Sequence, residues 1–114
     1  MLVYDAANQL ADDLKKSEVY LKYKESKDKL FADPEKKAKI EEFEKLKQEI
    51  QLMELRRQNH EEIDEEDKTK KMSELYTVLV SNQDIKEYFD CEIAFSKLMY
   101  DVNKIIGDAV KDVL

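Results

Sequence analysis

Few residues of this chain could do chemistry, and the residues that could lack the neighbours that such chemistry needs. His60 is the only histidine. A carboxylate-bridged metal site in a helical bundle uses a Glu-x-x-His pair on each of two helices. Arg57 stands three residues before His60, and there is no second histidine. We therefore interpret His60 as a solvated residue near a helix end, and we predict no metal site.

The acidic run from Glu61 to Asp67 and the single cysteine, Cys91, also have structural explanations. An EF-hand loop needs a central glycine, which the acidic run lacks, so helix capping explains the run better. No histidine or second cysteine adjoins Cys91 in sequence to lower its pKa, so it is expected to pack as a small hydrophobic residue. The only glycine, Gly107, excludes phosphate-binding loops and glycine-flanked nucleophiles. We expect no catalytic residue and no cofactor.

The composition is typical of long, solvated helices. The 114 residues are 41% charged and 42% hydrophobic, with one glycine and one proline to make turns. A net charge of −7 argues against a primary role on DNA or RNA, or on an anionic membrane surface, because these are bound through lysine and arginine. No apolar run is long enough to span a bilayer, and no signal peptide is recognisable. We expect a single cytoplasmic domain, residues 1–114.

Hydrophobic spacing predicts an all-α fold with five helices. The two long helices, about 34–60 and 84–114, are expected to run antiparallel in a bundle that oligomerises. Three shorter helices are expected over 3–16, from Ser17 to about Ala32, and from Asp64 to about Asn82. Ser17, Asp33 (followed by Pro34), Asp64 and Asp84 are the predicted N-caps, and Asn82 is a predicted C-cap.

The first long helix carries two sets of hydrophobic residues, a main seam and a smaller set on another side. Its seam has spacings of three and four residues, which is a heptad pattern too short for a sustained coiled coil. A second, smaller apolar spot lies off this seam. As core or interface candidates we name the seam residues Phe43, Leu46, Ile50 and Met53, and the off-seam residues Leu52 and Leu55.

The last helix carries the widest apolar surface. At about 100° per residue its hydrophobic positions cover roughly 200° of the helix, more than one neighbouring helix buries. Phe95, Met99 and Ile106 are its main core or interface candidates. Because the rest of the chain is so highly charged, we expect part of this stripe to be covered by a second copy.

Two polar residues, Glu92 and Asn103, lie within the apolar arc and point in the same direction, about three turns apart. Burying a carboxylate or an amide is unfavourable unless it is hydrogen-bonded. One interpretation is that each bonds a Lys, Tyr or backbone group on a facing helix and fixes the register. The other is that this part of the stripe meets a partner or a cavity.

Several ordered features resemble the YlbF/YheA-type small helical proteins of Gram-positive bacteria, which include YmcA, and most closely the shorter YheA-like branch. These features span nearly the whole chain. They are Tyr4-Asp5-Ala6-Ala7 with Leu10, Ser17-Glu18 with Tyr20 and Tyr23-Lys24, Ala32-Asp33-Pro34-Glu35 leading to Phe43, and Glu92, Leu98 and Asn103-Lys104-Ile105-Ile106-Gly107.

The resemblance implies an all-α fold that assembles as dimers or larger oligomers. It also implies an adaptor role beside a partner complex and a membrane-anchored endoribonuclease, with effects on competence, biofilm formation and sporulation. Some members hold iron–sulfur clusters through cysteines that include a C-terminal tail; here Cys91 is the only cysteine. We expect a non-enzymatic regulator whose partners are itself, other family members or an RNase-associated complex. The alternative is an RNA-associated factor that uses a local basic patch.

Overall fold

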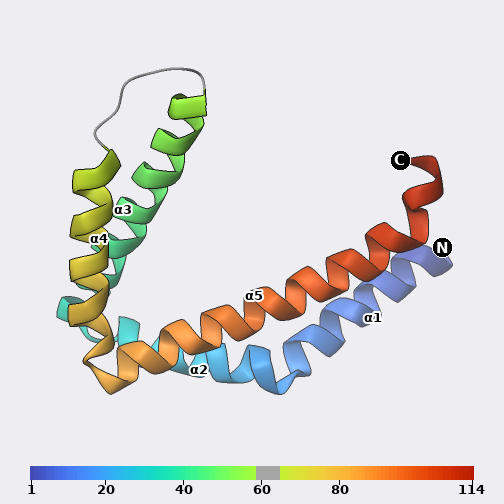
Figure 1. Cartoon of the computed structure of the whole chain (residues 1–114). Coiled ribbons are helices and arrows are strands. Elements are labelled where there is room, and N and C mark those ends of the chain that lie inside the picture. The colour runs from blue at the N-terminus through green and yellow to red at the C-terminus, as the bar shows by residue number, and fades with distance from the viewer. Residues whose placement is uncertain (59–64) are drawn as a thin grey trace. The chain divides into compact units, whose positions relative to one another are not determined.

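The computed structural model describes residues 1–58 and 65–114, and the side chains of residues 1–55 and 67–114. Every regular element in these residues is helical, which confirms the predicted all-α fold (Figure 1). Arg56, Arg57, His60, Asp64 and most of the acidic run lie outside the described side chains. The elements are α1 (Leu2–Lys16), α2 (Glu18–Phe31), α3 (Pro34–Gln58), α4 (Glu65–Val80), α5 (Gln83–Val110) and the 3-10 turn η1 (Lys111–Val113).

Side-chain caps explain where α2 and α3 begin, and both predicted caps are confirmed. The Ser17 hydroxyl accepts a hydrogen bond from the Tyr20 amide at 3.2 Å, and it donates one to the Leu14 carbonyl at 2.6 Å. The Asp33 carboxylate accepts bonds from the Glu35 and Lys36 amides at 3.0 and 3.3 Å. These caps satisfy amides that have no partner within the helix.

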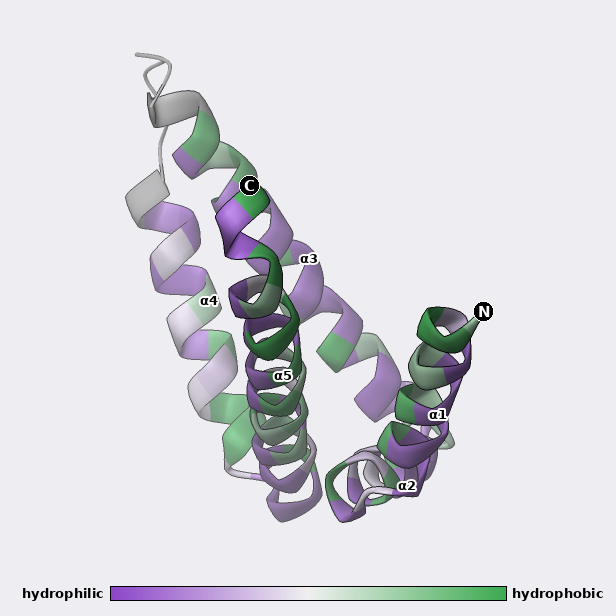
Figure 2. Cartoon of the chain, turned by 90° about the vertical axis from the view of Figure 1, so that its right-hand side faces the viewer, coloured by the Kyte–Doolittle hydropathy of each residue, from purple (hydrophilic) through white to green (hydrophobic). Residues whose placement is uncertain are grey.

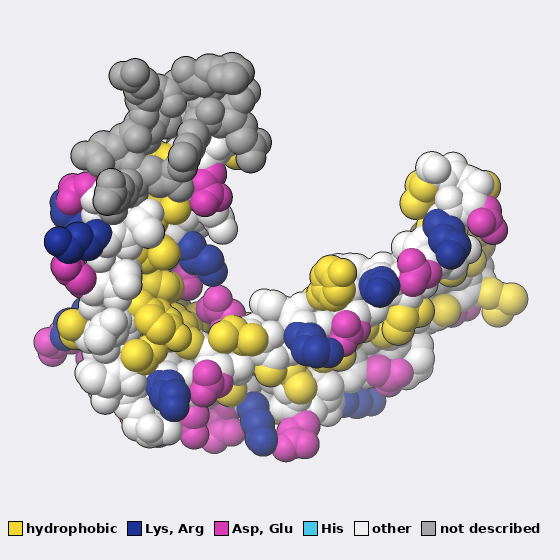
Figure 3. Space-filling view, viewed as in Figure 1, with side chains coloured by type: hydrophobic (Ala, Val, Ile, Leu, Met, Phe, Trp, Pro, Cys, Tyr) yellow, Lys and Arg dark blue, Asp and Glu magenta, His cyan; other side chains and the backbone are white. Residues whose placement is uncertain are grey.

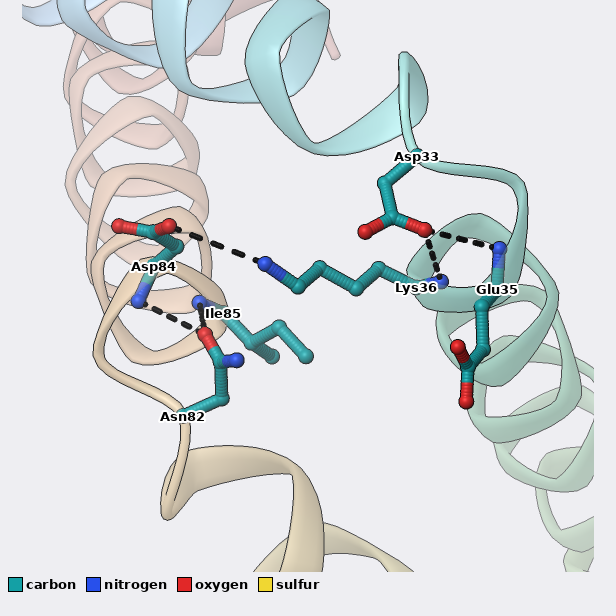
Figure 4. Close-up of polar contacts among 6 residues, drawn as sticks. All are labelled: Asp33, Glu35, Lys36, Asn82, Asp84 and Ile85. Atoms are coloured by element: carbon teal, nitrogen blue, oxygen red, sulfur yellow. Dashed lines mark hydrogen bonds and ion pairs between the residues drawn. The ribbon is translucent and has the colours of Figure 1, made fainter.

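The cap of α5 differs from the prediction, because Asn82 and not Asp84 holds this position. The Asn82 side-chain oxygen accepts hydrogen bonds from the amides of Asp84 at 3.0 Å and Ile85 at 3.2 Å (Figure 4). Asp84 lies in the first turn, where its carboxylate is 3.9 Å from the Lys36 ammonium. Both residue types are good caps, so the sequence alone could not choose between them. The Asn82 amide also donates to the Leu79 carbonyl at 3.1 Å at the end of α4, so its predicted C-cap role stays a prediction beside this N-cap role.

The far end of α5 was also misplaced by the prediction. The α-helix ends at Val110, and η1 follows, whereas the sequence pattern favoured one helix to Leu114. Tightening of a last turn into 3-10 geometry is common where terminal carbonyls lack partners. Hydrophobic spacing alone does not detect such a change, because Val113 keeps the apolar pattern.

The chain divides into two compact units, residues 30–86 and residues 1–29 with 87–114. Both α2 and α5 contribute residues to each unit. In the first unit, α3 and α4 pack against each other. Its buried side chains are Leu30, Ile40, Phe43, Ile50, Leu79 and Ile85. The predicted pairing of the two long helices, and the single domain, stay predictions.

The second unit is held by aromatic contacts between α2 and α5. The Tyr23 ring lies 5.6 Å from the Tyr88 ring and 5.5 Å from the Phe95 ring, and Tyr20 lies 6.1 Å from Phe95, measured between centroids. Tilted ring pairs at such distances are favourable. Among the described residues of this unit only Tyr88 and Phe89 are buried hydrophobic side chains, and α1 has no buried residue.

Candidate interaction surfaces

Nothing in the described part of the chain gathers the groups that a metal or a nucleophile needs. No three His, Cys, Asp or Glu side chains among the described residues are placed to share a metal ion. Cys91 is half-buried, and burial raises the pKa of its thiol, with a further contribution from the Glu87 carboxylate. A raised pKa lowers the thiolate fraction, which is the reactive form. Cys91 is therefore placed for packing and not for nucleophilic chemistry.

Several lysines of α3 and α4 lie beside carboxylates, which bears on the alternative of an RNA-binding patch. Lys68 bonds Glu49 at 2.8 Å, and the hydrogen bond to Lys68 lowers the pKa of Glu49. Lys71 lies 3.7 Å from Asp67, and other exposed lysines of α3 pair with residues one turn away. Positive and negative side chains are accordingly mixed over this hairpin in Figure 3. Such mixing weakens attraction to phosphates.

The predicted seam of α3 lies mostly within the hairpin. Phe43 and Ile50 are buried, Leu46 and Met53 are half-buried, and the Phe43 ring is 5.8 Å from the Tyr76 ring of α4. The two off-seam residues differ, since Leu52 is 50% exposed and Leu55 is 58% exposed. The seam therefore serves the α3–α4 core, whereas Leu52 and Leu55 remain candidates for an interface.

The predicted stripe of α5 is covered only in part. Phe95 and Met99 are half-buried, and Ile106 is 51% exposed. Hydrophobic residues recur along α5 and α1 in alternation with hydrophilic ones (Figure 2). Exposed hydrophobic side chains continue over both termini of the unit: Met1, Leu2, Val3, Tyr4, Ile105, Ile106, Val110, Val113 and Leu114. Exposed large hydrophobic side chains gathered in one unit favour an interaction site.

The two polar candidates in the stripe are not both buried within the chain. Glu92 is half-buried, but Asn103 is exposed, and no described polar residue is buried. The described residues of this chain therefore do not bury Asn103, and its predicted bond to a facing helix stays a prediction. Ile105 and Ile106, close to Asn103 on α5, are also exposed. Few side chains of the same chain therefore cover this turn. Its burial at an interface stays a prediction.

Sequence reasoning left three exposed hydrophobic residues of α5 outside the predicted stripe: Ile93, Tyr100 and Ile105. Ile93 is 64% exposed and Tyr100 is 66% exposed. The separation of these two by seven residues, two helical turns, was the available signal. They extend the apolar surface of α5 beyond the roughly 200° assigned from the sequence.

No helix in the described part of the chain is both long enough and apolar enough to cross a bilayer.

Known proteins resemble this chain in sequence, and a solved structure resembles it in fold. A UPF0342 protein of Halothermothrix orenii is 36% identical over 106 residues, which cover 93% of this chain and 86% of that protein. A UPF0342 protein of Caldicellulosiruptor bescii is 34% identical, covering 96% and 88% of the two chains. A crystal structure of Bacillus subtilis RicA in complex with RicF contains a chain of similar fold, with a TM-score of 0.60 and 24% identity, covering 96% of this chain and 94% of that one.

The similarity extends to a named family. Residues 3–111 match the family described as control of competence regulator ComK, YlbF/YmcA. The match includes all of α5 and nearly all of α1, so it takes in most of the exposed hydrophobic residues described above, without Met1, Leu2, Val113 and Leu114. This confirms the resemblance drawn from the sequence, and the chain belongs to the YlbF/YmcA family.

Proposed function

We propose that this protein is a non-enzymatic, cytoplasmic regulator or adaptor that acts through protein–protein contacts, including contacts with a second copy of itself. The observation that supports this most is the unburied apolar surface of residues 1–29 and 87–114. In that unit only Tyr88 and Phe89 are buried hydrophobic side chains among the described residues. A unit of this size needs a larger core, or a partner, to be stable.

The family supports the same proposal. Its description is the control of a competence regulator, which is a regulatory role. The crystal structure of similar fold holds two proteins, RicA and RicF, in one complex. We extend the proposal to competence, biofilm formation, sporulation or RNA-processing control, with family members or an RNase-associated complex as partners.

Affinity purification with matched variants tests the proposal. The tagged protein is expressed in its native host, and the proteins that it retains are identified by mass spectrometry. The double variant Tyr100→Asp/Ile106→Asp places charge on the exposed apolar side of α5, and Val78→Asp places the same charge on an exposed position of α4. We expect the wild type and Val78→Asp to retain the untagged chain and one defined set of partners, and the α5 variant to lose them.

Two results would contradict the proposal. The first is recovery of the same proteins with all three forms, because the apolar surface of α5 would then be dispensable. The second is that deletion of the gene leaves competence, biofilm formation, sporulation and RNA processing unchanged, which would remove the regulatory assignment. The rival RNA-binding role predicts RNA binding that is strong at low salt and weak at high salt. No binding at low salt removes that rival.

A further inference from the structure

The turns that lead into α3 and α5 are built alike. Asp33 precedes α3, and Asn82, 49 residues later in the chain, precedes α5. Each side chain accepts hydrogen bonds from the amides two and three residues ahead (Figure 4). Each backbone amide donates to the carbonyl of a leucine three residues back, Leu30 at 3.0 Å and Leu79 at 3.1 Å, and both leucines are 1% exposed. The segment α2–turn–α3 is therefore repeated as α4–turn–α5.

The correspondence extends along the helices at the same offset of 49 residues. Most hydrophobic residues that are buried or half-buried in the first segment correspond to hydrophobic residues that are buried or half-buried in the second. The corresponding residues are Tyr23 and Met72, Phe31 and Val80, Ile40 and Phe89, Leu46 and Phe95, Ile50 and Met99, and Met53 and Val102. Because α2 corresponds to α4 and α5 to α3, the contact of α2 with α5 should follow the contact of α4 with α3.

A known contact between α2 and α5 supports this equivalence. The Tyr23 ring of α2 lies 5.5 Å from the Phe95 ring of α5. The corresponding residues of the hairpin are Met72 of α4 and Leu46 of α3, and both are half-buried. Residues that touch between α2 and α5 therefore correspond to residues that are shielded from solvent in the α3–α4 hairpin.

Corresponding positions keep their burial even where their chemistry differs. In the hairpin Lys68 bonds Glu49 at 2.8 Å. The corresponding residues are Val19 of α2 and Leu98 of α5, and all four side chains are half-buried. An ion pair in one helix pair thus stands where the other has two hydrophobic residues.

The opposite exchange occurs at the contact between Phe43 and Tyr76. In the hairpin these two rings lie 5.8 Å apart between centroids, and Phe43 is 9% exposed. The corresponding residues are Glu92 of α5, which is half-buried, and Lys27 of α2. Two residues of opposite charge therefore occupy the positions that two aromatic rings occupy in the hairpin.

The ring contacts within residues 1–29 and 87–114 place Glu92 and Lys27 on the same stretch of α2 and α5. Tyr88, Glu92 and Phe95 follow at spacings of four and three, so they share one side of α5. The Tyr23 ring contacts both rings, at 5.6 Å from Tyr88 and 5.5 Å from Phe95. Lys27 is one turn after Tyr23 and shares its side of α2. Glu92 therefore faces α2 where the Lys27 side chain can reach it.

We propose that the Lys27 ammonium and the Glu92 carboxylate form an ion pair between α2 and α5, which sets the register of these two helices. A half-buried carboxylate among aromatic rings is unfavourable without such a partner. An ion pair in this setting stabilises less than well-packed hydrophobic side chains of similar volume. The α2–α5 pair therefore opens more easily than the α3–α4 pair, and its opening adds Phe95 to the exposed hydrophobic residues of α5. This property belongs to the single chain and does not depend on a partner.

Charge exchange in the intact chain tests the ion pair. Lys27→Glu faces Glu92 with a second carboxylate, and Glu92→Lys faces Lys27 with a second ammonium. We expect each variant to lower the melting temperature by about 5 °C, and Lys27→Glu/Glu92→Lys to regain most of that loss. In the control Lys24→Glu/Glu92→Lys, the exposed lysine lies further round α2 from the side of Tyr23, so nothing should be regained. Thermal unfolding followed by circular dichroism measures the series.

Transfer of the hairpin contact tests how easily α2 and α5 separate. The variant Lys27→Tyr/Glu92→Phe places the residue types of Tyr76 and Phe43 at the corresponding positions. We expect amide hydrogen exchange in α2 to slow about tenfold relative to the wild type at the same protein concentration, because opening becomes less favourable. Exchange in α4 should stay unchanged. Hydrogen exchange followed by mass spectrometry measures both helices in one sample.

Three results would overturn the proposal. Losses that simply add in Lys27→Glu/Glu92→Lys would exclude the ion pair, and recovery with Lys24→Glu would assign Glu92 to a different lysine. Unchanged or faster exchange in α2 of Lys27→Tyr/Glu92→Phe would contradict the claim that the ion pair eases opening. The charge series requires no new packing, so it decides the ion pair even if the aromatic variant fails to fold. None of these results bears on the proposed function, which rests on the exposed hydrophobic residues of α1 and α5.

Discussion

The two units of this molecule use their hydrophobic residues in different ways. Among the described residues of 30–86, six hydrophobic side chains are buried between and beside α3 and α4. Residues 1–29 and 87–114 bury only Tyr88 and Phe89 among the described hydrophobic residues, although α1 and α5 are both amphipathic. Residues 30–86 therefore bury their main hydrophobic side chains, whereas residues 1–29 and 87–114 leave most of theirs exposed. We call the latter the open unit.

The difference lies in the width of the apolar surfaces. The seam of α3 is narrow, and one partner helix, α4, is enough to cover it. The apolar surface of α5 extends from Phe95 around to Tyr100, and a helix that is hydrophobic over so much of its circumference is normally surrounded. The narrow seam is covered within the chain, and we propose that the wide apolar surface is covered by another chain.

Removal of a core side chain from the hairpin should have the largest effect on stability. Leu79→Ala deletes a side chain that is 1% exposed, and it should lower the free energy of unfolding by about 2–5 kcal/mol. The adjacent residue Val78 is 61% exposed, so Val78→Ala should change the free energy of unfolding by less than about 0.5 kcal/mol. Urea unfolding followed by circular dichroism checks both. Equal losses would show that the hairpin core is not closed as described.

Loss of a helix cap should have an intermediate effect in either unit. Asp33→Ala removes the acceptor for two amides at the start of α3, and Ser17→Ala removes the acceptor at the start of α2. Each should cost about 1 kcal/mol, and Asp33→Ser should restore most of the loss because serine is also a good cap. Thermal unfolding checks the series. An unchanged melting temperature for Asp33→Ala would contradict the cap.

Protein concentration should affect the two units differently. If a second copy completes the open unit, amide hydrogen exchange in α1 should slow as the concentration rises. For a dimer above its dissociation constant, the exchange rate in α1 should fall about threefold for each tenfold rise in protein concentration. The reason is that the monomer fraction falls as the square root of concentration. Exchange in α3 and α4 should stay constant. If exchange in α3 and α4 slowed as much as exchange in α1, the claim that only the open unit is completed by a second copy would be contradicted.

The ion pair between Glu49 and Lys68 should have the smallest effect. The hydrogen bond from Lys68 holds the pKa of Glu49 below its ordinary value of 4.5. The pair therefore stabilises the fold above that value, and this contribution is lost as the pH falls through the lowered pKa. Glu49→Gln should be slightly less stable than wild type at pH 7 and indistinguishable from it at low pH. A difference that grows on acidification would contradict this sign.

Local chemistry in the sequence was sufficient to predict much of the fold. The all-α class, the caps at Ser17 and Asp33 and the boundary at Pro34 depend on residues within one turn of each other. The choice of Asn82 over Asp84 was not predictable, because both residues are good caps two positions apart. The end of α5 at Val110 was not predictable from apolar spacing, which continues to Val113.

The sequence predicted which residues of α5 are candidates for an interaction surface, but not which of them are exposed. Periodicity identified Phe95, Met99 and Ile106 but could not tell which of them the chain itself covers. That depends on the aromatic contacts of Tyr20 and Tyr23 with α5, which bring together residues far apart in sequence. For the same reason Asn103 was assigned to a possible core and is exposed.

The molar mass of the purified chain in solution tests the central claim most directly. Light scattering coupled to size-exclusion chromatography at micromolar concentration, repeated over a dilution series, gives this mass without a label. Self-association predicts at least twice the 13.5 kDa mass of one chain, falling on dilution. A constant 13.5 kDa at every concentration would contradict it, and the open unit would then have to be stable alone.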